Sequence, residues 1–383
     1  YNQEKYVNKE NKYHINNYID ENFQKGLIPL NILQHVFFLS KYTIRNNFIH
    51  TKSYAYTVII SILFPCLVIF AVYSNFPSEN GLTDVYYAMI LHSTLYCIEC
   101  IILFFNNIYV SKLTVQLILN VQKILRIFKQ PGNDLKRWEI ENWIALFCNF
   151  LIYFLIITIC VNFEGFTWST KTLYGILYIF ALIYFDVNII CAFRYMNLVN
   201  RCFKLWMYNF QIYSDRISQI SISATRNIQI DLKTYFDAYN IIIDSFNTQT
   251  CRQSKIMYNI LIFVYVLEIE INVLFYFKTI SILVQLYVFC WIFKNILQTS
   301  LCIMECEYFY IHVVEVERMC TFQLTQCELT GLKKLLKNVR RINRTRFTKM
   351  TACGLFNIDA TFPFKLVNLF AAYNIVLLQF AFP

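Results

Sequence analysis

The apolar run after Pro363 constrains the fold more than any other feature of this sequence. It continues to the end of the chain with one charged residue, Lys365, near its start, and a helix of ~20 apolar residues can cross a bilayer. At a turn of ~100° per residue, one stripe of this helix is polar at both ends and small or apolar between. The stripe consists of Lys365, Asn368, Ala372, Ile375 and Gln379. Such a stripe is useless against lipid but fits a narrow water path, so the sequence predicts a pore-lining helix.

Further apolar segments precede this run, separated by charged or glycine-containing stretches. We expect each to be a membrane-crossing helix, over residues 53–73, 84–110, 142–161, 172–195, 256–277 and 280–303. Only 15% of the chain is charged and 57% is hydrophobic, whereas soluble domains carry ~25% charged residues. This composition predicts an all-α, polytopic membrane protein with seven transmembrane helices. The net charge of +10 lies between the apolar segments and not on one soluble face, so we exclude nucleic acid as a partner.

Several spans are expected to continue as amphipathic or polar helices on one side of the membrane. These extensions cover residues 111–129, 197–220 and 304–326, and further amphipathic helices are expected at 27–38, with Pro29 near its start, and at 231–255. We divide the chain into a cytosolic amino-terminal segment (1–52), six helices with a ligand-binding bundle and cytosolic extensions (53–303), a cytosolic anchor segment (304–356) and the pore-lining seventh helix (357–383).

The distribution of basic residues predicts the orientation. Of the 34 Lys and Arg residues, 29 lie in the amino-terminal segment and in the connections on its side, and two, Lys171 and Lys278, lie in the other set of connections. Because Lys and Arg accumulate in cytoplasmic loops, the amino terminus is expected in the cytosol and the carboxyl terminus outside the cell.

The final helix also carries a motif. Tyr373 is followed by five residues and then by Gln379 and Phe380, which resembles the closing motif of insect gustatory receptors: Thr-Tyr, five hydrophobic residues, Gln-Phe. Ala372 stands where the family has Thr, and Asn374 occupies one hydrophobic position. Together with seven helices, an internal amino terminus and long cytosolic extensions, the chain resembles the insect gustatory and odorant receptor superfamily.

This resemblance implies a homotetrameric, ligand-gated cation channel. Four copies of the final helix would surround a central pore, the cytosolic segments would form an anchor domain, and each subunit would hold a ligand pocket among its other helices. Gln379 and Phe380 would lie at the outer narrowing of the pore, where a ring of apolar Phe380 side chains can gate by dewetting. Tyr373 faces away from the polar stripe and is expected to pack between helices.

Charged residues inside the predicted spans are the second functional signal. Each costs ~2.5–3.5 kcal/mol on an insertion scale, so each needs a partner or water. The group comprises Glu99, Asp186, Glu268, Glu270 and Lys294. One lysine cannot neutralise four carboxylates, so some acids are protonated, or a water-filled cavity exists, or a cationic or polyhydroxyl ligand completes the site. Structural pairing, for example of Lys294 with Glu268, is the alternative.

Aromatic residues surround the outer half of the same bundle. Tyr and Trp offer apolar faces with hydrogen-bonding tips, which suit a small organic ligand, although each could instead be a core or interfacial residue. With the mid-span His92, the candidate ligand-binding residues from this group are Tyr96, Trp168, Tyr178, Tyr287 and Trp291, and Tyr153 belongs to the same aromatic set.

The sequence therefore predicts a gustatory receptor of the sensory-neuron plasma membrane, gated by a tastant and permeable to cations. The excess of acids favours a bitter plant compound, and a sugar ligand is the alternative. A secondary transporter and a G-protein-coupled receptor are the alternatives from other classes, but no internal repeat is visible and the predicted orientation is opposite to that of a G-protein-coupled receptor. No catalytic residue, metal or cofactor is assigned.

Overall fold

The fold is described from a computed structural model of the chain. The structure describes residues 17–37, 39–53, 55–56, 58–59, 62–63, 66, 69–70, 110–128, 132–163, 170–219, 231–249, 282–326, 329–352, 356–365, 368, 371–372 and 375. Statements about structure below concern these residues.

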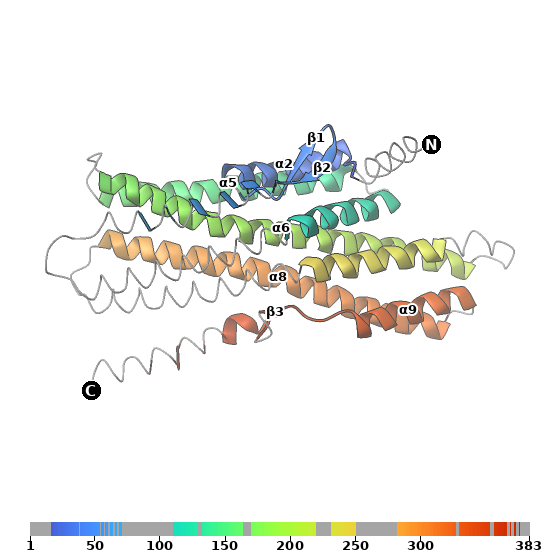
Figure 1. Cartoon of the computed structure of the whole chain (residues 1–383). Coiled ribbons are helices and arrows are strands. Elements are labelled where there is room, and N and C mark those ends of the chain that lie inside the picture. Colours follow the sequence, from blue (N-terminus) through green and yellow to red (C-terminus); the bar gives the residue numbers. More distant parts are fainter. Residues whose placement is uncertain are drawn as a thin grey trace, which may run out of the picture.

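The described chain is mostly helical and forms an elongated bundle (Figure 1). Its three long helices, α5 (Gly132–Phe163), α6 (Thr170–Gln219) and α8 (Ile282–Gln326), lie side by side. α2 (Glu21–Val36) packs on α5, and α9 (Thr330–Thr345) packs on α8. Residues 110–127 and 231–249 are also helical. The helices expected for 197–220 and 304–326 are confirmed as unbroken continuations within α6 and α8.

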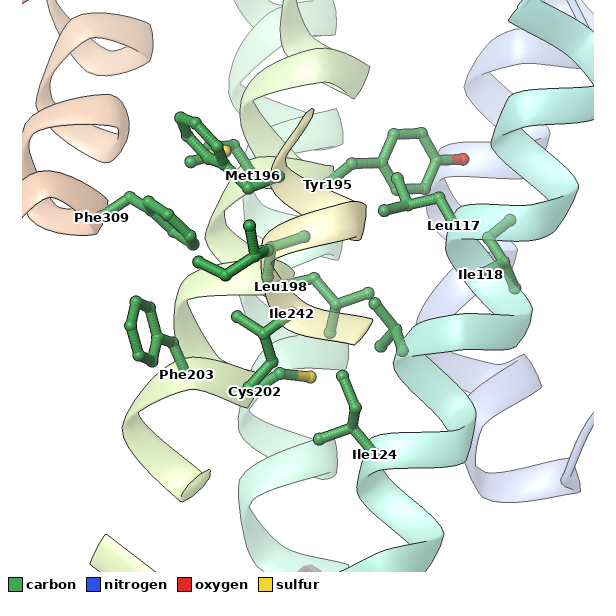
Figure 2. Close-up of a cluster of buried hydrophobic side chains, with 14 of the residues drawn as sticks. Leu117, Ile118, Ile124, Tyr195, Met196, Leu198, Cys202, Phe203, Ile242 and Phe309 are labelled. Atoms are coloured by element: carbon green, nitrogen blue, oxygen red, sulfur yellow. The ribbon is translucent and has the colours of Figure 1, made fainter. Parts of the chain in front are cut away.

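The apolar core between these helices is rich in aromatic side chains. Figure 2 shows how residues 110–127, 231–249, α6 and α8 contribute to it. Phe203 of α6 lies with its ring centroid 5.0 Å from that of Phe309 on α8, and Trp206 stacks on Phe210 at 4.9 Å. All four rings are fully buried. Because burying a large side chain contributes ~1.5–3 kcal/mol, this core fixes α6 against α8 over the half of the bundle that adjoins α9.

The amino-terminal region differs from the prediction in the start of its helix. The expected helix was 27–38, with Pro29 near its start, but α2 begins at Glu21 and Pro29 lies in its interior. Packing stabilises the additional turn at the start of α2, because Phe23 stacks on Trp138 of α5 with ring centroids 6.1 Å apart. Gly26 permits this contact: a Cβ there would come within 2.5 Å of the Trp138 ring. Tertiary contact, which sequence periodicity cannot report, therefore sets the start of α2.

Two short pairs of antiparallel strands correct the all-α expectation. β1 (Tyr42–Arg45) pairs antiparallel with β2 (Phe48–Thr51), and β3 (Thr351–Ala352) pairs with β4 (Phe356–Asn357). The turn between β1 and β2 consists of Asn46 and Asn47 with φ of 51° and 64°. Asn tolerates the left-handed region, which a two-residue hairpin loop of the primed type requires. The Asn-Asn pair is the sequence signal from which this hairpin could have been expected.

Within the part of the chain that the structure describes, no helix has the length and sustained apolarity of a membrane-crossing segment.

Candidate functional site

The structure brings together two of the charged residues that the sequence singled out. Asp186 on α6 and Lys294 on α8 form a buried ion pair, with side chains 7% and 2% exposed. The sequence analysis gave Glu268 only as an example of a structural partner for Lys294; Glu268 lies outside the described residues, and the pairing that the structure describes is with Asp186, on the helix that packs against α8.

Tyr153 of α5 completes this buried pair. Its hydroxyl donates a hydrogen bond to Asp186 Oδ2, the oxygen that also accepts from Lys294 Nζ. Lys294 Nζ also lies 5.5 Å from the centre of the Tyr153 ring, within the range of a cation–π contact. Tyr153, Asp186 and Lys294 tie α5, α6 and α8 together through one carboxylate oxygen. We call these three residues the outer clamp.

The chemistry of the outer clamp depends on its dry surroundings. Removing two charges from water costs several kcal/mol per ion, and their attraction repays this only while both partners are present. The outer clamp is therefore a buried contact between three helices that holds only while its partners are all in place.

A second polar cluster, which the sequence analysis did not identify, connects the same helices closer to the carboxyl-terminal ends of α6 and α8. Its centre is Glu141 of α5, whose two carboxylate oxygens each accept from Arg201 Nη2 at 2.6 Å. Arg194 Nη2 donates to the same carboxylate at 3.2 Å. Burial raises the pKa of the Glu141 carboxyl, but the hydrogen bonds and charges of Arg201 and Arg194 outweigh it, so that the net pKa is lowered. Glu141 is therefore ionised at neutral pH.

The cluster extends from Glu141 to α8. Arg201 Nε donates to Asn197 Oδ1 at 3.0 Å, and Asn197 Nδ2 donates to Glu305 Oε1 at 2.8 Å. Asn200 Nδ2 lies 2.7 Å from Glu305 Oε2 and 2.8 Å from the Glu305 carbonyl oxygen. A chain of hydrogen bonds thus runs from α5 through α6 to α8.

The cluster also reaches α2. Arg194 Nε donates to Asn142 Oδ1 at 2.5 Å, and Asn142 Nδ2 donates to the carbonyl oxygen of Gly26 at 2.8 Å. We call the whole cluster the inner clamp; it comprises Glu141, Asn142, Arg194, Asn197, Asn200, Arg201 and Glu305. The only sequence signal for it is the spacing of Arg194, Asn197 and Arg201, which places them on one face of a helix.

The two clamps are separated along shared helices. At ~1.5 Å per residue, Arg194 lies about 12 Å beyond Asp186 on α6, and Glu305 lies about 16 Å beyond Lys294 on α8. The inner clamp lies on the side of the bundle toward which α9 packs. The three helices are therefore joined by polar contacts at two separate levels of the bundle.

The other predicted site residues have different outcomes. Tyr178 lies in α6, and Tyr287 and Trp291 lie in α8. Asn368, Ala372 and Ile375 of the polar stripe are exposed and helical. Outside the described residues lie His92, Tyr96, Glu99, Trp168, Glu268, Glu270, Tyr373, Gln379 and Phe380.

Metal ligation finds no support in the described part of the chain, where no three His, Cys, Asp or Glu side chains gather closely enough to hold an ion.

Comparison with known proteins gives one informative result. No protein-family model matches the sequence, and no curated protein matches it. Among solved structures, the fold is similar to that of the insect olfactory receptor OR5 from Machilis hrabei, with a TM-score of 0.51 and 10% sequence identity. The likeness covers 93% of this chain and 98% of that receptor chain. The chain therefore has the fold of an insect olfactory receptor over nearly its whole length.

Proposed function

We propose that this protein is a subunit of a ligand-gated cation channel of the insect chemoreceptor type. The observation that carries the proposal is the fold likeness to an insect olfactory receptor, which covers 93% of this chain and 98% of that receptor chain. The Tyr373, Gln379 and Phe380 motif supports a gustatory rather than an olfactory role. No catalytic step, metal or cofactor forms part of the proposal.

The proposed setting is the plasma membrane of sensory neurons, with seven spans, the amino terminus in the cytosol and the carboxyl terminus outside. The charge asymmetry between the two sets of connections supports this orientation. An exposed apolar face on α5 supports contact with lipid or a neighbouring subunit, because soluble monomers rarely expose large apolar patches. This face consists of Ile140, Trp143, Ile144, Phe147, Leu151, Phe154 and Leu155.

Binding of the ligand is proposed at the outer clamp and the aromatic residues around it. A bitter plant compound with an amine or several hydroxyl groups competes with Lys294 or Tyr153 for Asp186, and a sugar is the alternative ligand. Opening the clamp frees α8 from α5 and α6 in the outer half of the bundle. The inner clamp keeps the same helices joined on the cytosolic side, so the release becomes a tilt.

The proposed pore is formed by the final helices of four identical subunits. The exposed helical positions Asn368, Ala372 and Ile375 fit a stripe that faces water. Phe380 closes the pore at its outer end, and Gln379 hydrates a passing cation without trapping it. Tilting of α8 is transmitted to the final helix through α9 and the segment that follows it, since α9 packs on α8.

Whole-cell recording tests the proposal. The chain is expressed alone and screened with panels of alkaloids, glycosides and sugars, beside Phe380→Ala and Asp186→Asn. We expect a ligand-evoked cation current in the unmodified chain, a raised resting leak in Phe380→Ala, and loss of the evoked current together with a raised resting leak in Asp186→Asn, because that change opens the outer clamp permanently.

Surface labelling controls for expression in these recordings. Substrate flux without single-channel steps would contradict the channel and favour a transporter. Glycosylation of Asn343, the acceptor in Asn-Arg-Thr, would contradict the orientation, because this residue is assigned to the cytosol.

A further inference from the structure

We propose that the start of α9 holds a binding site for a compact anion that carries several phosphates. A hollow of about 380 Å³ lies there, lined by Thr330, Lys333, Lys334, Lys337 and Asn338. Among the lining residues that the structure describes, three are cationic, two are neutral hydrogen-bonding groups, and none is a carboxylate. The site is separate from both clamps and goes beyond the proposed channel function.

The amphipathic pattern of α9 forces its lysines onto one face. Leu332, Leu335, Leu336 and Val339 are buried, and α9 packs on α8. The intervening basic residues therefore turn away from the bundle, and Lys334 and Lys337 are exposed. Folding therefore concentrates positive charge on this outward face of α9.

The helix terminus adds to this positive charge. The amino-terminal end of a helix carries about half a positive charge, which acidic residues normally offset. The first turn of α9 contains no acidic residue, and its N-cap, Leu329, makes no side-chain capping hydrogen bond. Lys333 and Lys334 thus lie close to a helix end that already favours an anion.

Among the described residues, two basic residues near the hollow form ion pairs with acidic residues, unlike the lysines that line it. Arg344 pairs with Glu317 at 3.7 Å, and Lys349 pairs with Asp359 at 3.8 Å. Over the described ranges, Lys333, Lys334 and Lys337 form no ion pair. The carboxylate nearest to them in sequence, Glu328, lies outside the described residues. The described residues supply no counterion to these three lysines, and an external anion would supply one.

Size and position narrow the class of ligand. Three ammonium groups bind phosphate as point charges, and Thr330 and Asn338 can donate further hydrogen bonds. A hollow of about 380 Å³ suits a small molecule rather than a folded partner. α9 follows the end of α8, which lies about 35 Å beyond residue 303 at ~1.5 Å per residue. That distance from the proposed membrane favours a soluble cytosolic phosphate compound over a lipid headgroup, which shares the same chemistry.

The test is titration calorimetry on the full chain in lipid nanodiscs, with inositol hexakisphosphate as the probe. The test variant combines Lys333→Gln, Lys334→Gln and Lys337→Gln. The control variant combines Lys112→Gln, Lys123→Gln and Lys136→Gln, three exposed lysines on other helices, so both variants lose the same net charge. The test variant loses three charge-assisted contacts, so we expect it to bind at least roughly a hundredfold more weakly. We expect the control to change affinity by less than about threefold.

The outcomes distinguish binding at this site from general electrostatic attraction. They also distinguish a soluble phosphate compound from a lipid headgroup as the ligand. Equal weakening in both variants, or no binding to the unmodified chain, overturns the proposal. Glu328→Gln should bind as tightly as the unmodified chain or more tightly; weaker binding overturns the assignment of the charge. Nanodiscs with and without phosphatidylinositol bisphosphate supply the second arm: lipid retained by the unmodified chain but not by the test variant supports the same site with a headgroup as occupant.

Discussion

The outer and inner clamps join the same three helices but differ in how many acceptor residues hold the described bonds. In the outer clamp, one oxygen of Asp186 accepts from both Lys294 and Tyr153. In the inner clamp, Glu141 accepts from two arginines, Glu305 accepts from two asparagines, and Arg201 joins the two halves through Asn197. We expect a clamp with one shared acceptor to open more readily to a single competitor, and a clamp with several acceptors to stay closed when one bond breaks.

Burial strengthens this contrast. The Asp186 and Lys294 side chains are 7% and 2% exposed, whereas Glu141 is 28% exposed. Water can replace a lost partner at Glu141 but not at Asp186, so removing one partner costs more at the outer clamp. The comparison predicts that the outer clamp is costly to break by mutation yet responsive to a ligand, and that the inner clamp supports the structure.

The largest effect is expected from Lys294→Met, which leaves the Asp186 carboxylate buried without its counterion. Breaking a buried pair in this way costs about 3–5 kcal/mol in the free energy of unfolding. The double variant with Asp186→Asn removes both charges and should recover most of this loss, but it should not recover the ligand-evoked current. Thermal unfolding in detergent and whole-cell recording measure the two quantities. A double variant as unstable as the single one would show that the pair is not the source of the effect.

The next effect is expected from Glu141→Gln, which removes the charge that Arg194 and Arg201 share. Arg194 is 6% exposed, so its guanidinium is left largely buried. We expect a loss of about 2–3 kcal/mol, smaller than for Lys294→Met because water reaches Glu141. Any ligand-evoked current in the surviving protein should keep its ligand dependence. A loss of ligand response at full stability would place Glu141 in the binding site and contradict the contrast.

The pH dependence of the inner clamp follows from the same residue. The folded-state pKa of Glu141 is depressed, so its contribution to stability is complete above the unfolded-state pKa and is lost as the pH falls through the folded value. Unfolding curves of the unmodified protein and Glu141→Gln should therefore converge as the pH falls below roughly 4. Curves that stay parallel down to pH 3 would show that Glu141 is not stabilised by its arginines.

Sequence reasoning succeeded for the fold wherever periodicity alone decides the structure. The helical continuation of residues 304–326 was expected from its pattern, and α8 ends at Gln326. It failed where contacts between distant segments decide, as at the start of α2, which depends on Trp138 more than a hundred residues later. It also missed the β1–β2 hairpin, whose Asn46 and Asn47 turn lies in the region assigned only as a cytosolic amino-terminal segment.

Sequence reasoning about the site shows the same limit. A charge inside an apolar segment is conspicuous, so Asp186 and Lys294 were identified, but which acid meets Lys294 depends on how the helices pack, and the sequence did not pair Lys294 with Asp186. Glu141 and Glu305 border apolar segments where charges are ordinary, so nothing marked them. Their role emerges only when α5, α6 and α8 place them beside Arg201, Asn197 and Asn200.

A smaller effect is expected from Gly26→Ala, at the end of the inner clamp where Asn142 binds α2. The new Cβ would lie 2.5 Å from the Trp138 ring, so α2 or the ring must move. Overpacking costs about 1–3 kcal/mol, and the better helix propensity of Ala returns about 1 kcal/mol. We expect a net loss of about 1 kcal/mol, measured by thermal unfolding. Trp138→Leu serves as the matched background, because there Gly26→Ala should be neutral or stabilising; an unchanged loss would locate the strain elsewhere.

The smallest effect is expected from Arg126→Gln, which breaks an ion pair outside both clamps. Arg126 donates to both carboxylate oxygens of Asp20 at 2.8 and 2.9 Å, but the two side chains are 48% and 45% exposed. The side-chain hydrogen bond from Arg126 lowers the pKa of Asp20, although burial opposes it. Water and salt screen an exposed pair, so we expect a loss of about 0.2–1 kcal/mol that shrinks further in high salt. The loss should also vanish once the pH falls through the lowered pKa of Asp20. If Arg126→Gln proved as costly as Glu141→Gln, bidentate geometry rather than burial would govern these ion pairs, and the contrast between the two clamps would lose its physical basis.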